Sequence, residues 1–362
     1  MLRLFACLSL IFFLVPVTYV RGPAPQANDS QYITLEPIVF DAGDPDRKQV
    51  GQLIFLGGWT ITSDNDDFGG ISSMVAMPDN RFLMLSDNGT LVGFTLAEEK
   101  HQAIRPFIAA LPDGPAKPEG SVRKNWDSES LLHNPETGQF WVGYEHQHSI
   151  WRYGHSFSRT EARNFPKAMQ KWPDNGGAEA MLRLPDGRFL VFSEAADHPE
   201  GGYQALAFEG DPSEPTSKAV AFGYLPPQGY KLTDAVLLDD RSALMLHRRF
   251  TPLHGVSAIL SIAQLADFRP GNIATSIPVA TLKPPLKVDN MEALAVSRDG
   301  KDTIVWIASD DNFSVLQESL LLKFRLLQGK ATQKKPDPKF QNEKAGASPG
   351  FSTFESDGSL KR

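Results

Sequence analysis

The sequence predicts an all-β protein: a β-propeller of five four-stranded blades, closed into a ring by an N-terminal strand. The first observation is a pattern repeated five times, in which a polar residue opens an apolar run, a turn follows, and a second apolar run ends in a charged residue. The second is the period, since the openings lie 57, 50, 55 and 58 residues apart. The third is that helical periodicity is scarce. A period of about 50 residues is typical of propellers and related arrays, because one unit cannot bury its apolar face alone.

The first 22 residues predict a signal peptide. Arg3 supplies a short positive region, and an apolar stretch from Leu4 to Val15 ends at Pro16. We therefore expect an exported protein, periplasmic or secreted. No clear cleavage motif follows, so an uncleaved anchor stays open as the alternative, although the stretch is only marginally long enough to span a bilayer. The single cysteine, Cys7, lies in this segment, so the mature chain would have no disulfide and no cysteine metal ligand.

The rest of the chain divides into three parts. Residues 23–50 predict a linker and an N-terminal strand, and residues 51–327 hold the repeats that predict the propeller domain. Residues 328–362 are rich in Lys, Pro, Gly and Ser and predict a disordered tail.

The third repeat shows most clearly why a unit should form a blade. Three apolar runs, Glu179–Leu184, Phe189–Phe192 and Tyr203–Phe208, follow one another, and Asp186-Gly187 separates the first two. Asp-Gly accepts the positive φ that a tight hairpin needs. A fourth run, Ala219–Leu225, precedes the next unit. Four strands per unit make the blade of a propeller.

The fifth unit lacks a fourth run of its own, which suggests how the ring closes. It ends at Leu320–Leu326, whereas Gln52–Thr60 is a spare strand ahead of the first unit. The two could pair and join the ends of the chain in one blade. Tyr32–Phe40 leaves a sixth blade open, and a β-sandwich with coincidental spacing is the other alternative.

The net charge of the chain limits the classes of molecule that it could bind. The net charge is -7 and the pI near 5.7, which argues against nucleic acid, whose phosphates need basic contacts. We expect a small anionic or ester substrate, no membrane contact after signal cleavage, and a monomer.

The ends of the repeated runs carry the candidate site. The first runs open at equivalent polar residues: Ser72, Glu129, Glu179, Asp234 and Glu292. The second runs end at Asp87, Glu145, Glu194, Arg248 and Asp310. In antiparallel strands these two positions share one end of a blade, so up to eight carboxylates would meet around one mouth.

Such a ring of carboxylates predicts a cation site, because buried like charges need compensation. Oxygen ligands favour Ca²⁺, with Mg²⁺ as the alternative. The predicted metal ligands are Asp87, Glu145, Glu194, Asp234, Glu292 and Asp310, and Glu129 and Glu179 are the predicted catalytic carboxylates. The alternative is that these acids cap loops and hydrogen-bond neighbouring blades. Two histidines, in Glu145-His146-Gln147-His148, lack a third nearby, and we interpret them as part of a solvated loop.

The fourth unit breaks the acidic pattern with His247-Arg248-Arg249. Two arginines beside an acidic ring could hold a phosphate or carboxylate by bidentate contacts, so these three residues are the predicted substrate-binding group. The alternative is that they neutralise Asp234 and its neighbours.

Several of these segments resemble the phytase-like propeller family, described as having esterase-like activity of phytase. The resemblance is carried by Asp67-Phe68-Gly69-Gly70-Ile71-Ser72, Leu85-Ser86-Asp87-Asn88-Gly89, Gly176-Gly177-Ala178-Glu179-Ala180, Leu246-His247-Arg248-Arg249-Phe250, Asn290-Met291-Glu292-Ala293-Leu294 and Ser309-Asp310-Asp311-Asn312-Phe313. It covers roughly residues 50–327, and an acid is usual where His247 stands. It implies an exported, calcium-associated propeller that hydrolyses phosphoesters or related esters.

Two hypotheses follow. One is a Ca²⁺-dependent hydrolase, in which a carboxylate orients water and Arg248 holds the leaving group or oxyanion. The other is a non-catalytic propeller that binds a ligand or partner and uses calcium for stability. A lactonase-type propeller is a third, and lactone substrates would reveal it.

Overall fold

The computed structural model describes residues 28–114, 127–253 and 255–327. The predicted signal peptide, Cys7 and the predicted tail lie outside these residues. The described residues form an all-β, propeller-like fold of 22 strands and three short 3₁₀ helices, with no α-helix among them. None of the helices in these parts of the chain is long and apolar enough to cross a membrane.

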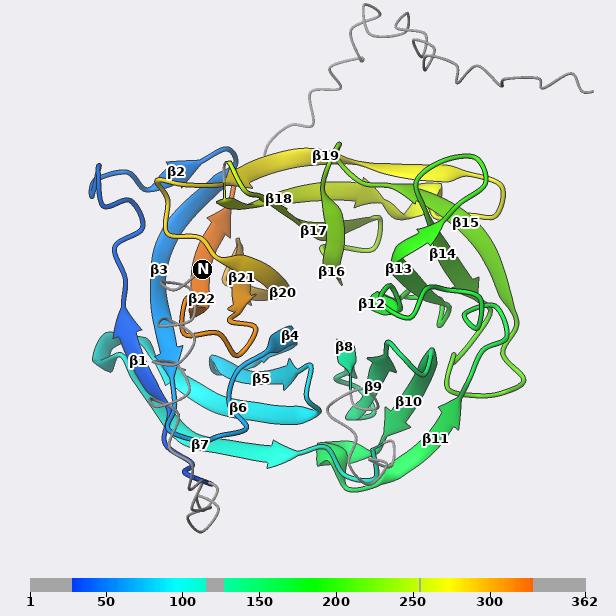
Figure 1. Ribbon diagram of the computed structural model, residues 1–362, viewed down its shortest axis with the longest axis horizontal. Helices are drawn as coiled ribbons and strands as arrows, with labels where there is room; N and C mark the ends of the chain where they lie inside the picture. The colour runs from blue at the N-terminus through cyan, green and yellow to red at the C-terminus, as the bar shows by residue number, and fades with distance from the viewer. Residues whose placement is uncertain (1–27, 115–126, 254, 328–362) are drawn as a thin grey trace, which may run out of the picture. The chain divides into compact units, whose positions relative to one another are not determined.

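The strands fall into five antiparallel sets of four around a central axis, with the first strand of each set innermost (Figure 1). Set one holds β4 (Ile71–Met77), β5 (Arg81–Ser86), β6 (Thr90–Ala97) and β7 (Gln102–Ala110). Set two holds β8 (Ser128–Asn134), β9 (Gln139–Tyr144), β10 (Ser149–Tyr153) and β11 (Thr160–Asn164). Set three holds β12 (Ala178–Arg183), β13 (Phe189–Asp197), β14 (Tyr203–Phe208) and β15 (Ala219–Leu225). Set four holds β16 (Lys231–Leu237), β17 (Ser242–Thr251), β18 (Gly255–Gln264) and β19 (Ile273–Leu282). Set five holds β20 (Asn290–Asp299), β21 (Asp302–Asp310), β22 (Ser319–Leu326) and β3 (Leu53–Thr62).

The hairpins form where the sequence places turn residues. Between β12 and β13, Gly187 has a φ of 87°, and the Asp186 side chain accepts the Arg188 N–H at 3.1 Å. Between β4 and β5, Asp79 and Asn80 have φ values of 63° and 54°. Positive φ at both central residues gives the turn whose twist matches antiparallel strands. The predicted strand runs and hairpins in these two sets are therefore present.

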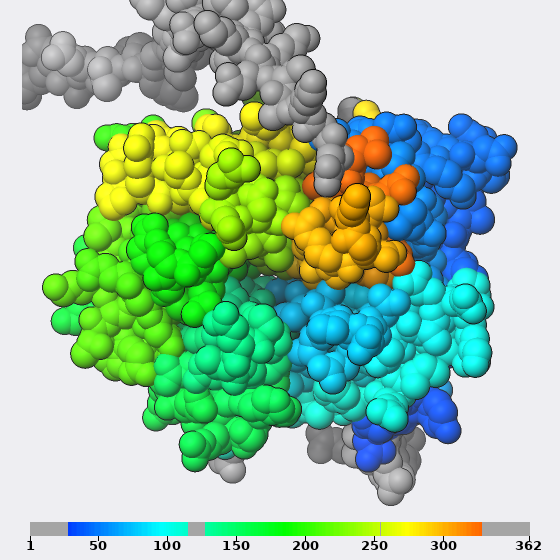
Figure 2. All heavy atoms as spheres, turned by 180° about the vertical axis from the view of Figure 1, so that it is seen from behind, coloured from blue at the N-terminus to red at the C-terminus, as the bar shows by residue number. Residues whose placement is uncertain are grey.

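The spare strand ahead of the first repeat, predicted at Gln52–Thr60, is β3, and it takes the fourth place in set five. Its antiparallel register with β22 runs from Ile61 opposite Ser319 to Leu53 opposite Leu326. The innermost strands touch their neighbours all the way around, and β20 returns to β4. Figure 2 shows from the opposite side how the sets surround a narrow central hollow.

Shorter strands join the edges of the sets. β1 (Thr34–Pro37) pairs with β3 and also touches β7, and β2 (Gln49–Val50) pairs with β3. The segment Tyr32–Phe40 thus extends the closure of the ring and builds no sixth set. At the outer edge, β15 and β19 pair in parallel and link sets three and four.

The apolar core is divided into five clusters, and each lies between two neighbouring sets. Between sets five and one, the Trp306 and Phe82 rings meet edge to face with centroids 4.7 Å apart. Between sets one and two, Leu85 packs in one cluster with Val142 and Tyr144. No set can therefore bury its faces alone, which is the physical basis of the sequence repeat.

Candidate active site at the acidic mouth

Each innermost strand carries a one-residue bulge close to its start. The pairing between first and second strand skips one residue in every set. The skipped residues are Ser72, Glu129, Glu179, Thr233 and Glu292. A bulge leaves its residue outside the ladder and re-aims the side chain, and bulges are common beside active sites. The sequence placed Asp234 in this series, but the backbone register puts Thr233 there and Asp234 one residue further along.

Two of the bulged residues join neighbouring sets by their hydroxyl groups. Ser72 donates to the carbonyl of Ser128 at 2.6 Å, and Thr233 lies 3.2 Å from the carbonyl of Met291. Both are buried. The bulge thus supplies a donor to the next set where the side chain is short, and places a carboxylate where it is glutamate.

Replacing Thr233 by valine should lower the free energy of unfolding by about 1 kcal/mol, because a buried carbonyl loses its donor while the side-chain volume is kept. Urea unfolding would measure the change. Thr281→Val, at an exposed position on β19, is the matched control and should be neutral. Equal effects of the two substitutions would contradict the bridging role of Thr233.

The predicted ends of the second runs lie beside the bulges: Asp87 and Glu145 directly follow β5 and β9, Glu194 and Arg248 lie within β13 and β17, and Asp310 ends β21. Register brings Arg248 opposite Lys231 and Asp310 opposite Asn290, and the Glu145 N–H donates to the Asp127 carbonyl at 2.7 Å. The structure therefore gathers the predicted positions at one end of the strands. The carboxylates and cations that meet there form the acidic mouth: Asp87, Asp127, Glu129, Glu145, Glu179, Glu194, Lys231, Arg248, Glu292 and Asp310.

Arg248 is the central cation of the acidic mouth. Its Nε lies 2.8 Å from Glu292 Oε1, and its Nη2 lies 3.3 Å from Glu194 Oε1. Lys231, which sequence reasoning missed, contacts the other oxygen of Glu194 at 2.8 Å. Its only signal in the sequence is its place at the start of the fourth repeat. One arginine thus joins carboxylates of sets three and five.

The carboxylates outnumber these cations, and burial makes their ionisation costly. Burial, followed by the charge of Glu179, raises the pKa of Glu129 well above its usual range. Burial and Glu194 do the same for the pKa of Glu179. Burial raises the pKa of Glu292 to about 8 even though Arg248 opposes the shift. These charges act on one another across three sets, so the glutamates form one cluster.

Two flanking acids show the same behaviour. Burial, followed by the nearby Asp127, raises the pKa of Glu145 to about 7. Burial raises the pKa of Asp310 to about 7, and the Asp87 charge adds to that shift. Asp87 therefore belongs to the electrostatic cluster.

In EDTA, the melting temperature should fall as the pH rises from about 5 to about 8. Over this window the folded protein holds protons on Glu145, Asp310 and Glu292 that the unfolded chain has released, so each rise in pH favours unfolding. Scanning calorimetry at several pH values tests this. Added Ca²⁺ should flatten the fall. A melting temperature that rises over this range in EDTA would contradict the raised pKa values.

Asp127, Glu145 and His146 form a group with metal-ligand character, since their ligand atoms lie within 4.8 Å of one another. The His146 Nδ1 lies 2.7 Å from the carbonyl of Asp174. Because a carbonyl only accepts, Nδ1 carries the proton and donates it. Nε2 lies 2.9 Å from Asp127 Oδ2, so a cation bound by both atoms would suit this pair. A carbonyl that fixes the histidine tautomer in this way is typical of metal sites.

His146 and Asp127 were absent from the predicted site. The sequence shows His146 next to Glu145, but the partner that completes the group, Asp127, opens the second set before its first strand. The His146 position thus differs from the solvated loop that was expected, because Asp127 and Asp174 hold both ring nitrogens.

Asp234 takes another role. Its carboxylate accepts the backbone N–H of Leu294 and that of Ala235, both at 2.8 Å, and it is buried. This is the alternative weighed from the sequence, in which an acid hydrogen-bonds the neighbouring unit. Its carboxylate oxygens are therefore already used within the ring.

The three residues His247, Arg248 and Arg249 lie in three different environments. His247 is fully buried, with Nε2 2.7 Å from the Tyr224 hydroxyl and Nδ1 3.2 Å from the Ile259 carbonyl. The Arg249 guanidinium lies over the Tyr230 ring at 4.5 Å. Successive side chains of a strand point to opposite faces, so the three could not share one site. Among the described residues, Arg248 is the member of the run with ion pairs to the acidic mouth.

Comparison with known proteins gives a family. The profile of the family described as phytase-like, esterase-like activity of phytase, matches residues 66–313. No curated protein matches the chain significantly in sequence. The chain is similar to the allergen Mala s 1 of Malassezia sympodialis, with 12% identity, coverage of 77% of this chain and 91% of that one, and a TM-score of 0.42. A luciferin-regenerating enzyme has 8% identity, coverage of 80% and 95%, and a TM-score of 0.39.

Proposed function

The chain belongs to the phytase-like family, and on that premise we propose that it is an exported hydrolase that cleaves phosphoester or related ester bonds with Ca²⁺ as its cation. The observation that supports this best is the meeting of a metal-ligating group, buried glutamates and Arg248 at one end of the ring. We interpret the five sets as the five blades of a propeller. The substrate would be a small anionic or ester molecule, and the protein a monomer.

The residues present fit a divalent cation. Asp127, Glu145 and His146 would hold it, and Glu129 and Glu179 stand beside Glu145 as further carboxylates. Glu194, Glu292, Asp87 and Asp310 add negative charge around it. A bound divalent cation would polarise a phosphoryl or carbonyl oxygen and neutralise developing charge. Carboxylate oxygens favour Ca²⁺ or Mg²⁺, while the imidazole would also suit a transition metal, so both kinds of ion need to be compared by assay.

Glu179 stands in set three, between Glu145 of set two and Arg248 of set four. The charges of Glu145 and Arg248 both act on it, in opposite directions. We assign Glu179 to orient the water and take its proton, with Glu129 as the second carboxylate able to do so. The water oxygen forms the new bond to phosphorus or carbon, the ester oxygen leaves with the bonding electrons, and it takes a proton from solvent. Arg248 holds the developing negative oxygen by its guanidinium.

The experiment compares p-nitrophenyl phosphate, phytate, p-nitrophenyl acetate and a γ-lactone after EDTA treatment, with Ca²⁺, Mg²⁺, Mn²⁺ or Zn²⁺ added back. We expect turnover of at least one ester, lost in EDTA and restored best by Ca²⁺. Asp186→Asn, in the exposed turn of set three, is the control that should keep full activity. Absence of metal-dependent turnover on all four substrates would overturn the proposal.

One observation favours the alternative, a non-catalytic propeller that binds a ligand and uses calcium for stability. Lys231 and Arg248 already contact Glu194 and Glu292, so a substrate anion must displace carboxylates to reach them. In that case Ca²⁺ raises the melting temperature and no substrate turns over.

A further inference from the structure

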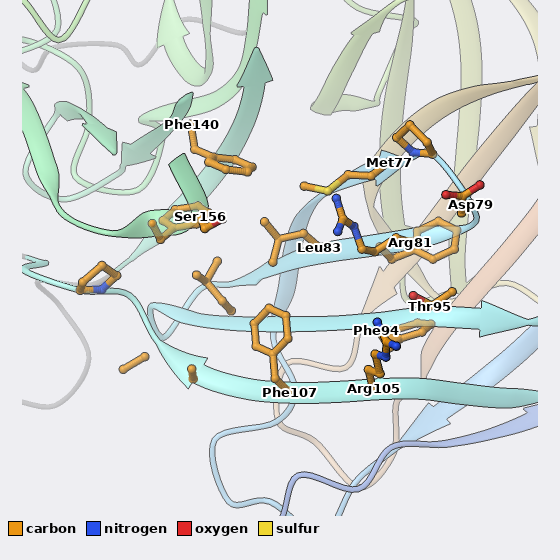
Figure 3. Close-up of a pocket in the computed structure, with 17 residues that line it drawn as sticks. Met77, Asp79, Arg81, Leu83, Phe94, Thr95, Arg105, Phe107, Phe140 and Ser156 are labelled. Atoms are coloured by element: carbon orange, nitrogen blue, oxygen red, sulfur yellow. The ribbon is translucent and has the colours of Figure 1, made fainter. Parts of the chain in front are cut away.

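A cavity lies between sets one and two, and no residue of the acidic mouth lines it. Its volume is about 860 Å³, within the range of small-molecule pockets. Figure 3 shows that its wall is built by strands of set one, with Phe140 and Ser156 of set two on the far side. The β4–β5 turn contributes Asp79, and this turn lies at the opposite end of β4 from the bulged Ser72.

The wall from set one has a polar row and an apolar row. Arg81 pairs with Thr95, and Thr95 pairs with Ile104, next to Arg105. Two residues further along, Leu83 pairs with Gly93 and Gly93 with Phe107. Residues two apart on β5 and β6 share a face, so Arg81 stands beside Leu83 and Thr95 beside Gly93. On β7, Arg105 and Phe107 both line the cavity. Guanidinium groups therefore stand at one end and apolar groups follow.

Local backbone features place these side chains. The β6–β7 register shifts between Gly93 and Thr95, which makes a bulge at Arg105, whose φ is 50°. Positive φ at a long side chain is uncommon, and such strain gathers at ligand sites. The Phe107 ring lies directly over Gly93, where an added Cβ would stand 2.1 Å from the ring. Only glycine at this position lets Phe107 lie flat on the wall.

The opposite wall is aromatic. Phe140 and Phe157 stack with ring centroids 4.4 Å apart, and both are buried. Ser156 and Phe157 also have positive φ values, of 54° each. Both walls of the cavity therefore contain residues with positive φ, Arg105 in set one and Ser156 and Phe157 in set two.

The charged side chains that line the cavity indicate which class of ligand it would bind. Within the part of the chain that the structure describes, no ion pair joins Arg81 or Arg105 to a carboxylate. Asp79 is the one acid among the lining residues, so cationic groups exceed acidic ones at this end. Exposed guanidinium groups beside an open apolar wall favour an anion with an apolar body.

We propose that this cavity binds an amphipathic carboxylate, with its head group between Arg81 and Arg105 and its apolar body against Leu83, Phe107 and Phe140. The inference does not depend on the proposed hydrolase activity, because it uses none of the acidic-mouth residues.

Titration calorimetry with decanoate, decan-1-ol and decyltrimethylammonium tests the proposal, because the three share one chain and differ in head-group charge. Decanoate should bind tightest. Arg81→Gln with Arg105→Gln should weaken decanoate binding by at least about tenfold and leave decan-1-ol unchanged. Arg188→Gln, in the exposed turn of set three, is the matched control. Phe107→Ala should weaken all three ligands.

Equal affinity for the three ligands, or tighter binding of the cationic one, would overturn the head-group assignment. Unchanged decanoate affinity in the double variant would overturn the site itself. The replaced arginines are exposed, so the double variant should keep the wild-type melting temperature, which the same samples report.

Discussion

Glu179→Gln is expected to reduce metal-dependent ester hydrolysis by about 10²–10⁴-fold, because a neutral amide cannot take the proton of the attacking water. The substitution keeps the size of the side chain and removes a buried carboxyl group whose ionisation is costly beside Glu194 and Glu145. In EDTA, the melting temperature should therefore stay the same or rise. Loss of turnover without loss of stability is the combination that a purely structural role would not give.

Initial rates and scanning calorimetry on the same preparation measure both effects. Glu136→Gln, in the exposed turn between β8 and β9, is the control and should behave as wild type. Glu129→Gln separates the two candidate carboxylates, since the one that takes the proton should show the larger fall in kcat. Full activity in both variants would show that neither glutamate serves as the base.

Arg248→Met is expected to destabilise the fold by about 2–3 kcal/mol, because it leaves Glu194 and Glu292 buried without their shared cation. This loss of unfolding free energy is smaller than for a fully buried ion pair, because the Arg248 side chain is 33% exposed. The loss should be larger at pH 8 than at pH 5, where Glu292 carries its proton and needs no cation. Urea unfolding at the two pH values measures this.

A double substitution sharpens the test. Adding Glu292→Gln to Arg248→Met should recover part of the stability, since the pair is removed together. Arg249→Met is the neighbouring control: its guanidinium lies over Tyr230, and its loss should cost less than about 1 kcal/mol. If both arginine variants lose the same stability, the ion pairs of Arg248 do not stabilise the fold more than the contact of Arg249 with Tyr230.

The fold was largely accessible from the sequence because its signals are local and repeated. An Asp-Gly pair such as Asp186-Gly187 favours a tight turn when it stands between two apolar runs. Five similar units need neighbours, because no unit can bury its apolar faces alone. The family resemblance, drawn from the same repeated segments, was confirmed over residues 66–313. The spare strand that is now β3 followed from counting strands per unit.

The candidate site was accessible only in part. The sequence placed Glu145 beside Glu129 because adjacent antiparallel strands fix which ends meet. It did not reveal Asp127 and His146 as partners, since Asp127 lies outside any strand and its contact depends on the path of the chain before β8. It also aligned Asp234 where the bulge puts Thr233, because a repeat read by residue type cannot locate a one-residue shift in backbone register.

The sequence by itself determined the repeating strands, the turns between them, and the acidic residues that recur where those strands begin and end. These depend on neighbours in the chain, whose chemistry a single sequence displays. Only the tertiary structure decided which of these residues meet. Packing of five sets around one axis brings Arg248 between Glu194 and Glu292, sends His247 into the core, and opens a cavity between Arg81 and Phe140. Contacts between separate sets depend on register and burial, which arise only when the ring has closed.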